Sequence, residues 1–465
     1  MFETRGVPNT LRGEPLTTLR ETPRTIPVTA EVDVVVAGGG PAGWAAAVAA
    51  ARAGARTLLI ERYGYLGGMA TGALVIALDH WDDFEKKETV IGGLAREIVD
   101  RLAVMGGAIV QDLADTHTID QRAWDKWGRY GWASTRVTRH QPEPLPFGAV
   151  IDPERFKWVA NRMLLEAGVK LQYHSWVVGA VCEGERVRGV VLESKSGREA
   201  ILAKVVIDCT GDGDVFAAAG AEFVRGELYV TLPHQVANVD TAKFLAWERD
   251  NPDEAAELVR EAKERLHAKG AYWWLYTVFD GLLWVNAPTF YKLDILNVDH
   301  LTRVEVEGRD IIEAWWEWSR TKLPGFERSY VVDVAAQTGL RASRLLKGEH
   351  VLTKQEIDDG VIFPDTIGRS KHWYLPYRSL VPERMDGLLV AGRCYSVTPQ
   401  GLAISREVPT MMVLGQAAGT AAAMAVRHDV HPRNVDVSDL RRALASQAVI
   451  LESGVPAADA PAAVR

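Results

Sequence analysis

Two apolar runs in the first part of the chain flank a stretch with a different pattern. Residues 32–36 and residues 57–60 are short and continuously apolar, which is typical of buried strands. Between them, residues 42–53 are rich in alanine, which favours a helix, and Gly54 follows at a place where helices commonly end. The pattern therefore predicts a strand–helix–strand unit of about the minimal length for two parallel strands.

A second set of patterned segments follows residue 150. Asp152 and Pro153 combine a capping carboxylate with a proline at the first helical position, so we expect a helix to begin there. This helix continues to about Glu166 and ends at Gly168. Short runs rich in β-branched residues then predict strands at residues 169–174, 176–182, 186–193, 200–209 and, much later, 387–391.

The apolar segment at residues 408–426 is long enough to resemble a membrane span. Gln416 interrupts it, the other residues are dominated by alanine, glycine and threonine, and no aromatic belt flanks it. We therefore interpret it as a buried helix that packs closely on a sheet.

The middle of the chain has a different character. Residues 253–267 and 302–322 are amphipathic at helical spacing. Aromatic side chains are concentrated in the same region, and most of them are expected to fill core, while a few line a substrate cavity. The tryptophans concerned are Trp273, Trp274, Trp284, Trp315, Trp316 and Trp318.

Composition narrows the class of protein. The chain has 465 residues, of which 47% are apolar and 25% charged, as in an ordinary globular protein. A formal net charge of -8 argues against a general surface for nucleic acid or for anionic membranes. The three cysteines are far apart, without a CxxC pair, and the first thirty residues contain no readable signal peptide. We expect a soluble, cytoplasmic protein without a disulfide scaffold.

Three glycines carry the first chemical signal. Gly38, Gly40 and Gly43 form G-x-G-x-x-G directly after the first predicted strand and before the predicted helix. In this position the glycines allow a tight turn, close approach of a pyrophosphate to the backbone, and close helix–strand packing. Glu61 ends the next strand, 18 residues after the last glycine, where a carboxylate accepts hydrogen bonds from ribose hydroxyls and repels a 2'-phosphate. A dinucleotide other than NADP is predicted.

Three further stretches accompany this fingerprint. Residues 62–71 read RYGYLGGMAT, residues 206–214 read VIDCTGDGD and residues 388–393 read LLVAGR. With them the chain resembles the FAD-dependent oxidoreductases related to the fumarate reductase and succinate dehydrogenase flavoproteins, in particular the bacterial branch with the Gly-Gly-Met-Ala-Thr motif. The resemblance covers residues 32–74, 152–226 and 329–426. It implies an α/β fold, with a Rossmann-like FAD-binding domain of the glutathione reductase type and an inserted α+β substrate or cap region.

The resemblance also implies a set of cofactor-binding residues. The ADP half of FAD would be held by the glycine loop, Glu61 and the backbone of the strand that contains Val177 and Val178, and the flavin half by residues from the later motifs. The residues concerned are Gly38, Gly40, Pro41, Ala42, Gly43, Glu61, Arg62, Gly67, Gly68, Met69, Ala70, Thr71, Val177, Val178, Thr210, Gly211, Asp212, Gly392, Arg393, Leu402 and Ala403.

Two departures from related enzymes refine the cofactor. Covalent relatives carry a histidine that is linked to the flavin, and residues 67–71 contain none, so we expect noncovalent FAD. No second glycine fingerprint is present, which argues against a built-in NAD(P)H site. No His/Asp/Glu cluster has convincing metal-ligand spacing, so no metal is expected.

Candidates for catalysis come from two segments. Arg406 is expected to begin the C-terminal helix near the flavin face, where a cation would stabilise an anionic flavin or a substrate carboxylate, with an ordinary salt bridge as the alternative. In the resembling family the segment with Tyr374, Tyr377 and Arg378 approaches the active site, so these side chains are candidates for a base or an anchor, with simple packing as the alternative. Arg341 and Arg344 are further candidates for anion binding.

These observations divide the chain into seven parts. The expected parts are an N-terminal arm (1–30), a first FAD-binding part (31–80), an insertion near the active site (81–147), a second FAD-binding part (148–226), a substrate or cap domain (227–328), a third, flavin-contacting part (329–430) and a C-terminal tail (431–465).

The leading hypothesis is a dehydrogenase or oxidase. A small organic substrate, apolar or aromatic in character, gives a hydride to FAD, and oxygen or a separate carrier accepts the electrons. A reductase of an activated C=C bond uses the same parts. A flavin monooxygenase and a non-enzymatic protein with structural FAD are further alternatives. Neither a nucleic acid nor a membrane is expected as a partner, and a homo-oligomer stays open.

Overall fold

The computed structural model describes residues 3–6, 17, 19–79, 81–83, 87–118, 120–130, 147–268 and 274–453. Its centre is a sheet in which β2 (Val28–Ala37) lies between β12 (Gly197–Asp208) and β3 (Thr57–Ile60), with all three strands parallel. Val34, Val35 and Val36 are fully buried, as expected for a parallel strand that is covered on both faces.

Further strands extend this sheet on both sides. On one side β9 (Lys170–Gln172) continues the parallel order after β3. On the other side β10 (Trp176–Glu183), β11 (Arg186–Ser194) and the first half of β12 form an antiparallel meander, and β23 (Leu388–Val390) pairs in parallel with the last residues of β12. The carboxyl ends of β2, β12 and β23 therefore meet at one edge, where open α/β sheets bind ligands.

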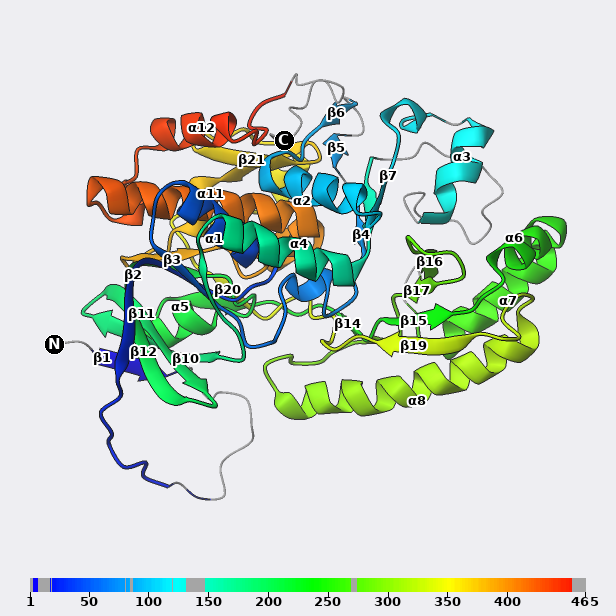
Figure 1. Cartoon of the computed structure of the whole chain (residues 1–465), viewed down its shortest axis with the longest axis horizontal. Helices are drawn as coiled ribbons and strands as arrows, with labels where there is room; N and C mark the ends of the chain where they lie inside the picture. The colour runs from blue at the N-terminus through cyan, green and yellow to red at the C-terminus, as the bar shows by residue number, and fades with distance from the viewer. Residues whose placement is uncertain are drawn as a thin grey trace.

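Two apolar helices cover the sheet side by side (Figure 1). α1 (Pro41–Arg52) packs against α11 (Val408–His428), and small residues allow a close approach. A Cβ atom on Gly415 would lie 2.0 Å from the carbonyl oxygen of Ala42, so this contact requires glycine. The interpretation of residues 408–426 as a buried helix is confirmed. In the part of the chain that is described, no helix combines the length and apolarity needed to span a membrane.

Gln416 is explained by a neighbouring helix. Its Oε1 accepts a hydrogen bond of 2.8 Å from the backbone N–H of Leu94, in the first turn of α2 (Gly93–Val104). The polar residue that interrupts the apolar helix therefore satisfies an N–H group that the start of another helix leaves free.

The middle of the chain builds a separate sheet to the right of the central one in Figure 1. Its strand order is β16 (Trp274–Tyr276), β17 (Leu283–Val285), β15 (His234–Ala237) and β19 (Tyr330–Val334), all antiparallel. Three helices accompany it: α6 (Thr241–Asp250), α7 (Pro252–Arg265) and α8 (Val298–Lys322).

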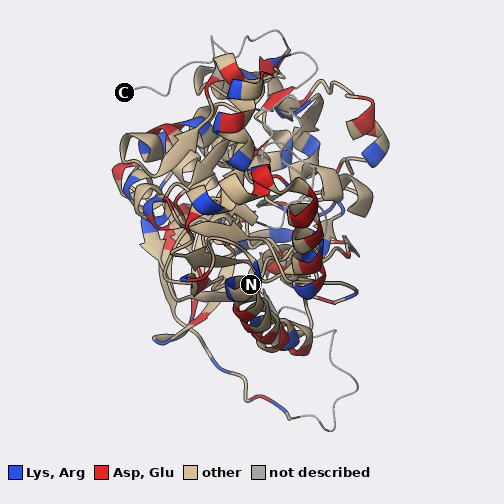
Figure 2. Cartoon of the chain, turned by 90° about the vertical axis from the view of Figure 1, so that its right-hand side faces the viewer, with Lys and Arg blue, Asp and Glu red and all other residues tan. Residues whose placement is uncertain are grey.

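Acidic and basic residues are interspersed on the face shown in Figure 2, which looks onto this part of the molecule. On α8 they form ion pairs one helical turn apart, such as Arg303 with Glu307 at 2.8 Å.

Shorter elements complete the described chain. The helices are α3 (Gln121–Trp127), α4 (Pro153–Glu166), α5 (Asp214–Ala219), α9 (Lys354–Asp358), α10 (Pro399–Ser405) and α12 (Val437–Ser446). The strands are β1 (Glu3–Gly6), β4 (Ala77–Leu78), β5 (Asp82–Asp83), β6 (Glu88–Thr89), β7 (Ala108–Val110), β8 (Ala149–Ile151), β13 (Phe223–Arg225), β14 (Val230–Thr231), β18 (Thr289–Phe290), β20 (Arg344–Leu346), β21 (Thr366–Ser370) and β22 (Trp373–Pro376).

The structure adds detail to three of the expected parts. The N-terminal arm contains β1, which pairs with β10 at the edge of the central sheet. The insertion at 81–147 contains α2 and α3, and its proline-rich run at 141–146 lies outside the described residues. The C-terminal tail includes α12, whose buried Leu440 and Leu444 lie four residues apart. In each case tertiary contacts stabilise elements with weak local signals.

Candidate active site

The glycine loop between β2 and α1 has the geometry of an anion-binding turn. The backbone at Gly38 has φ of +97°, and a Cβ there would lie 2.5 Å from the carbonyl oxygen of Cys209. A Cβ on Gly43 would lie 1.7 Å from the carbonyl oxygen of Gly38. Gly40 differs, since a Cβ there would meet no protein atom within 4 Å. No side chain caps the N-terminus of α1, so its first N–H groups are available to a phosphate.

Glu61 lies beside this loop at the end of β3. Its carboxylate accepts a hydrogen bond of 2.6 Å from the backbone N–H of Gly39 and one of 2.9 Å from that of Tyr63. Burial raises the pKa of Glu61, and the two backbone hydrogen bonds oppose this shift. The carboxylate both fixes the loop and lines the adjacent cavity, where ribose hydroxyls would be suitable donors.

A second loop follows β12 and lies against the first. The carboxylate of Asp208 accepts hydrogen bonds from the backbone N–H groups of Thr210, Val215 and Phe216 at 2.9–3.0 Å, and from the Thr210 hydroxyl at 2.7 Å. One buried carboxylate thereby ties the loop at residues 210–213 to the start of α5. The sequence motif VIDCTGDGD is explained by this arrangement, because its first aspartate holds the glycine turn in place.

A buried ionic network joins this loop to the third motif. Asp212 accepts from Arg393 at 2.5 Å and from the Ser343 hydroxyl at 2.8 Å, while Arg344 donates to the Asp212 carbonyl oxygen and to the carboxylate of Asp214. Burial raises the pKa of Asp212, but Arg393 and Arg62 outweigh it, so that the pKa falls below its ordinary value.

Asp214 shows the opposite balance. Burial and the nearby charges of Asp212 and Asp208 raise its pKa to about 6, although Arg344 opposes the shift.

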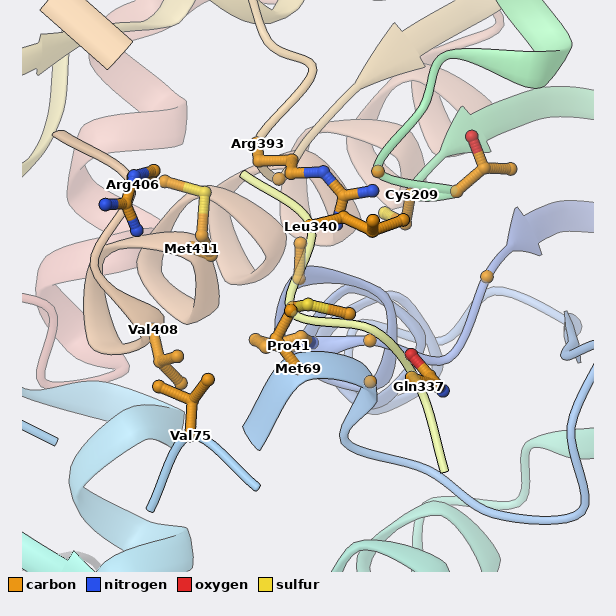
Figure 3. A pocket seen from close by; sticks show the side chains of 18 of the residues that line it. Pro41, Met69, Val75, Cys209, Gln337, Leu340, Arg393, Arg406, Val408 and Met411 are labelled. Carbon is orange, nitrogen blue, oxygen red and sulfur yellow. The ribbon is translucent and has the colours of Figure 1, made fainter. Parts of the chain in front are cut away.

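The loops open onto a cavity of about 410 Å³. In Figure 3, Arg406, Val408 and Met411 approach it from the start of α11, and Pro41 approaches it from the start of α1. Among the residues that sequence reasoning assigned to the cofactor, the lining includes Gly38, Gly40, Pro41, Ala42, Glu61, Arg62, Gly68, Met69, Val177, Thr210, Gly211, Gly392 and Arg393.

Arg406 also lines the cavity, and its environment is unusual for an arginine. Across the described residues its side chain makes no hydrogen bond and no ion pair, and its Nε atom is buried without a partner. The alternative of an ordinary salt bridge is therefore not seen. Arg341 lines the same cavity and donates to the Thr231 hydroxyl at 3.0 Å and the Gly339 carbonyl oxygen at 2.7 Å. Burial and the charge of Arg406 lower the pKa of Arg341 to about 10.

Several assigned residues do not line the cavity. Leu402 is fully buried and Ala403 is exposed, and both belong to the short helix α10. The helix that begins at the cavity is α11, with Glu407, Val408 and Met411 in the lining. The peptide groups predicted to face the flavin therefore belong to the helix before the one that reaches the cavity. The other assigned residues outside the lining are Gly43, Gly67, Ala70, Thr71, Val178 and Asp212.

Tyr374, Tyr377 and Arg378 also lie outside the cavity lining. The Tyr377 hydroxyl is buried and donates to the Pro432 carbonyl oxygen at 2.7 Å, and burial raises its pKa. Arg378 forms an ion pair of 3.0 Å with Asp365, and Tyr374 is buried in β22. The structure therefore does not bring these three candidates to the site, because their segment packs beneath α11 and the C-terminal part of the chain.

Sequence reasoning missed most of the opposite wall. Trp284 and Leu275 come from the middle sheet, Asn286 follows β17, and Tyr229 precedes β14. The concentration of aromatics in the middle region was the available signal, and Trp284 is one of the tryptophans named on that basis; Trp273 lies outside the described residues. Which of these rings face the cavity depends on tertiary packing.

The fold and site together define a dinucleotide-binding α/β enzyme. The chain belongs to the FAD dependent oxidoreductase family, whose model matches residues 33–374 and 369–444. The protein is therefore an FAD-dependent oxidoreductase, and the glycine cradle, the free N-terminus of α1 and the Glu61 carboxylate suit that cofactor.

Individual relatives match over limited lengths or at low identity. Urocanate reductase from Eggerthella lenta is 36% identical over 87 residues, covering 18% of this chain and 14% of the relative. Digeranylgeranylglycerophospholipid reductase 2 from Methanopyrus kandleri is 27% identical over 184 residues, covering 39% and 38%. The chain thus matches less than half the length of either relative.

Two solved structures align with most of this chain at low sequence identity. A geranylgeranyl bacteriochlorophyll reductase-like protein from Thermoplasma acidophilum aligns with a TM-score of 0.46 and 14% identity, over 90% of this chain and 84% of that one. An L-amino acid deaminase from Proteus myxofaciens aligns with a TM-score of 0.43 and 13% identity, over 94% and 97%.

Proposed function

We propose that the protein is an FAD-dependent dehydrogenase or oxidase that accepts a hydride from a small organic anion with an apolar body. The observation that carries this proposal is Arg406, a guanidinium without a protein partner among the described residues, in the same cavity as the dinucleotide loop. Arg406 is half-buried, and a partly desolvated cation without a partner is costly, so a site that keeps one is suited to an anionic ligand.

The residues of the cavity divide between the two halves of noncovalent FAD. The glycine loop and the free N–H groups of α1 would hold the pyrophosphate, Glu61 the ribose, and the backbone near Val177 the adenine. A register shift between Val177 and Gly179 leaves Val178 out of the β10–β11 pairing, which frees backbone groups for this purpose. Gly392, Arg393, Met69 and the start of α11 would hold the flavin half, as the Gly-Gly-Met-Ala-Thr branch implies.

When bound, FAD supplies the acceptor for the two electrons of a hydride. The chain's own residues prepare the site. Arg406 and the positive end of α11 would stabilise negative charge on a bound flavin and on the substrate. Arg341, held by Thr231 and the Gly339 carbonyl, adds a second fixed cation. Trp284 and Leu275 provide an apolar wall that excludes water and contacts the body of the substrate, which is the role expected of a substrate or cap region.

A reductase of an activated C=C bond is the second candidate. Two curated relatives that match this chain are named as reductases, and a hydride acceptor with an anionic group would use the same arginines. A flavin monooxygenase shares the fold but has less support, since the last flavin strand is followed by Gly392-Arg393 where related hydroxylases usually carry Gly-Asp.

An anaerobic absorbance titration of the holoenzyme distinguishes these reactions. Small alcohols, amines and hydroxy or amino acids are added, each acid alongside its neutral amide. Bleaching of the flavin spectrum by an acid but not by its amide, with recovery in air, supports the proposal. Bleaching only by an external reductant, followed by reoxidation with an unsaturated acid, supports the reductase instead. A spectrum that responds equally to acids and amides contradicts the role of Arg406.

A further inference from the structure

Five side chains form a continuous stack at the adenosine end of the cavity. The guanidinium carbon of Arg62 lies 5.3 Å from the ring centroid of Trp176 and 4.9 Å from that of Tyr63. Tyr63 stacks on Tyr65 at 5.4 Å with an interplanar angle of 13°, and the Lys157 ammonium lies 4.6 Å from the Tyr65 ring centroid. Cations and rings thereby support one another in one array, which fixes the Arg62 and Trp176 side chains.

Trp176 is the open end of this stack. Trp176 is one of the residues that line the cavity, and it is 54% exposed, which is unusual for a residue of its size. It immediately precedes Val177, where the strand pairing shifts register, and Arg62 immediately follows Glu61. The stack therefore lies at the end of the cavity that contains the Glu61 carboxylate. Arg341 and Arg406 come from a much later part of the sequence.

We propose that Trp176 is the stacking wall of the adenine site, held in place by Arg62 and the aromatic rings behind it. The purine of FAD packs against the exposed part of the indole, while the backbone of the shifted strand provides its hydrogen-bonding edge. Trp176 is thus a positioning residue for the cofactor, and it acts on retention of the adenosine half. The inference rests on FAD as the cofactor and is independent of the direction of the reaction and of the substrate.

The physical basis is the large planar surface that base and indole share. Stacking of a base on an aromatic side chain is sequence-tolerant and survives in water, so an exposed ring is sufficient when it is held rigidly. Arg62 contributes rigidity as well as charge, because its planar guanidinium stacks on rings in a way that a lysine ammonium does not. Without the stack, a tryptophan at a half-exposed strand end would have free rotamers and would lose part of its binding energy on ordering.

The test is the rate at which the purified holoenzyme releases FAD on dilution, measured as FAD that passes an ultrafiltration membrane. We expect Trp176→Ala to release FAD about 5- to 150-fold faster than the native protein, the range that corresponds to losing one base–aromatic stack. Trp176→Phe retains a ring and should restore most of the retention. Trp176→Leu retains apolar volume without an aromatic face and should behave like the alanine variant.

Trp158 offers a matched control. It lies on α4, is also 54% exposed and does not line the cavity, so Trp158→Ala should release FAD at the native rate. Circular dichroism of the holoenzymes separates stacking from a general structural role. A native spectrum with faster release supports the proposal, whereas a release rate for Trp176→Ala and Trp176→Leu equal to that of the native protein overturns it. Loss of retention in Trp176→Phe as large as in Trp176→Ala overturns it as well. None of these readouts requires a substrate, so they stand even if the proposed reaction is wrong.

Discussion

The two ends of the cavity are built in different ways. At the adenosine end, the turn, the helix start and the carboxylate come from one continuous stretch, from Val36 to Arg62, and backbone geometry dominates. At the opposite end, Tyr229, Trp284, Arg341 and Arg406 come from four segments of the chain, and side chains dominate.

This difference determines what each end tolerates and what it specifies. The backbone cradle depends on the absence of side chains at Gly38 and Gly43, so almost any substitution at these two positions damages it. Dinucleotide-binding proteins in general share this way of holding a pyrophosphate. A site of converging side chains tolerates changes more gradually and sets the identity of the ligand. The first end suits the FAD cofactor, and in the proposed function the second end selects the substrate.

The largest expected effect is at the cradle. In Gly43→Val, the Cβ position 1.7 Å from the Gly38 carbonyl oxygen forces the loop away from α1. We expect no FAD to be retained after purification and the free energy of unfolding to fall by more than about 3 kcal/mol. Absorbance at the flavin band measures the retained FAD, and urea denaturation measures the free energy of unfolding.

Gly40→Ala is the matched control for that change. Its Cβ meets no protein atom, and its backbone φ of -66° is open to alanine, so the stability of the protein should change by less than about 0.5 kcal/mol. The methyl group points into open space beside the pyrophosphate site and should weaken FAD binding alone. Equal destabilisation by both variants would contradict the distinction between a packing glycine and a ligand-facing one.

Arg406→Gln tests the side-chain end. Removal of the unpaired cation should lower kcat/KM for an anionic substrate by about 10- to 100-fold, the loss expected for one charged hydrogen bond. For the neutral amide of the same substrate, kcat/KM should fall by less than about 3-fold, because the amide carries no charge for Arg406 to bind. Arg384→Gln, an exposed arginine outside the cavity, should leave both values unchanged. A similar loss with acid and amide would show that Arg406 supports the site without contacting the substrate.

Asp214 allows a test by pH at the boundary between the two ends. Its folded-state pKa of about 6 is above the ordinary value of 3.8, so folding favours the protonated form. The stabilisation is complete below about pH 4 and is lost as the pH rises through 6. Relative to Asp214→Asn, which does not titrate, the native protein should lose up to about 3 kcal/mol of stability between pH 4 and pH 7.

Urea denaturation at several pH values measures this difference, with Asp310→Asn on the exposed face of α8 as the control. A constant difference between native protein and Asp214→Asn across the range would mean that Asp214 stays ionised. In that case Arg344 would outweigh burial and the charges of Asp208 and Asp212.

The same contrast explains which features could be predicted from the sequence. Residues 28–60 form the expected strand, helix and strand, because the apolar periodicity and the glycines act locally. The long buried helix was also predictable, since its composition leaves few other possibilities. Leu402 and Ala403 were assigned to the flavin through the family resemblance, which does not show that the chain forms two helices here and that the second, α11, begins at the cavity.

Side chains that converge from distant segments were harder to predict. Arg406 could be proposed from its place before a helix, but its lack of a partner depends on what surrounds it in three dimensions. Trp284 and Asn286 belong to a short strand and its end in the middle sheet, and alternation along a three-residue strand does not show which face meets the cofactor domain. Trp176 was not singled out, because its exposure and its contact with Arg62 depend on tertiary packing.

Tyr377→Phe is the smallest and most exacting change, since it removes one oxygen from a residue that sequence reasoning placed among the catalytic candidates. The hydroxyl donates to the Pro432 carbonyl oxygen at 2.7 Å and is buried away from the cavity, so its loss should reduce stability by about 1 kcal/mol. Turnover should remain native at every pH, because no proton of the reaction can reach a hydroxyl that is enclosed in the core. Steady-state kinetics measure turnover, and thermal unfolding of the same preparation measures stability. A fall in kcat larger than 10-fold with unchanged stability would show that Tyr377 belongs to the active site. The end of the cavity that is built from side chains would then include the segment beneath α11.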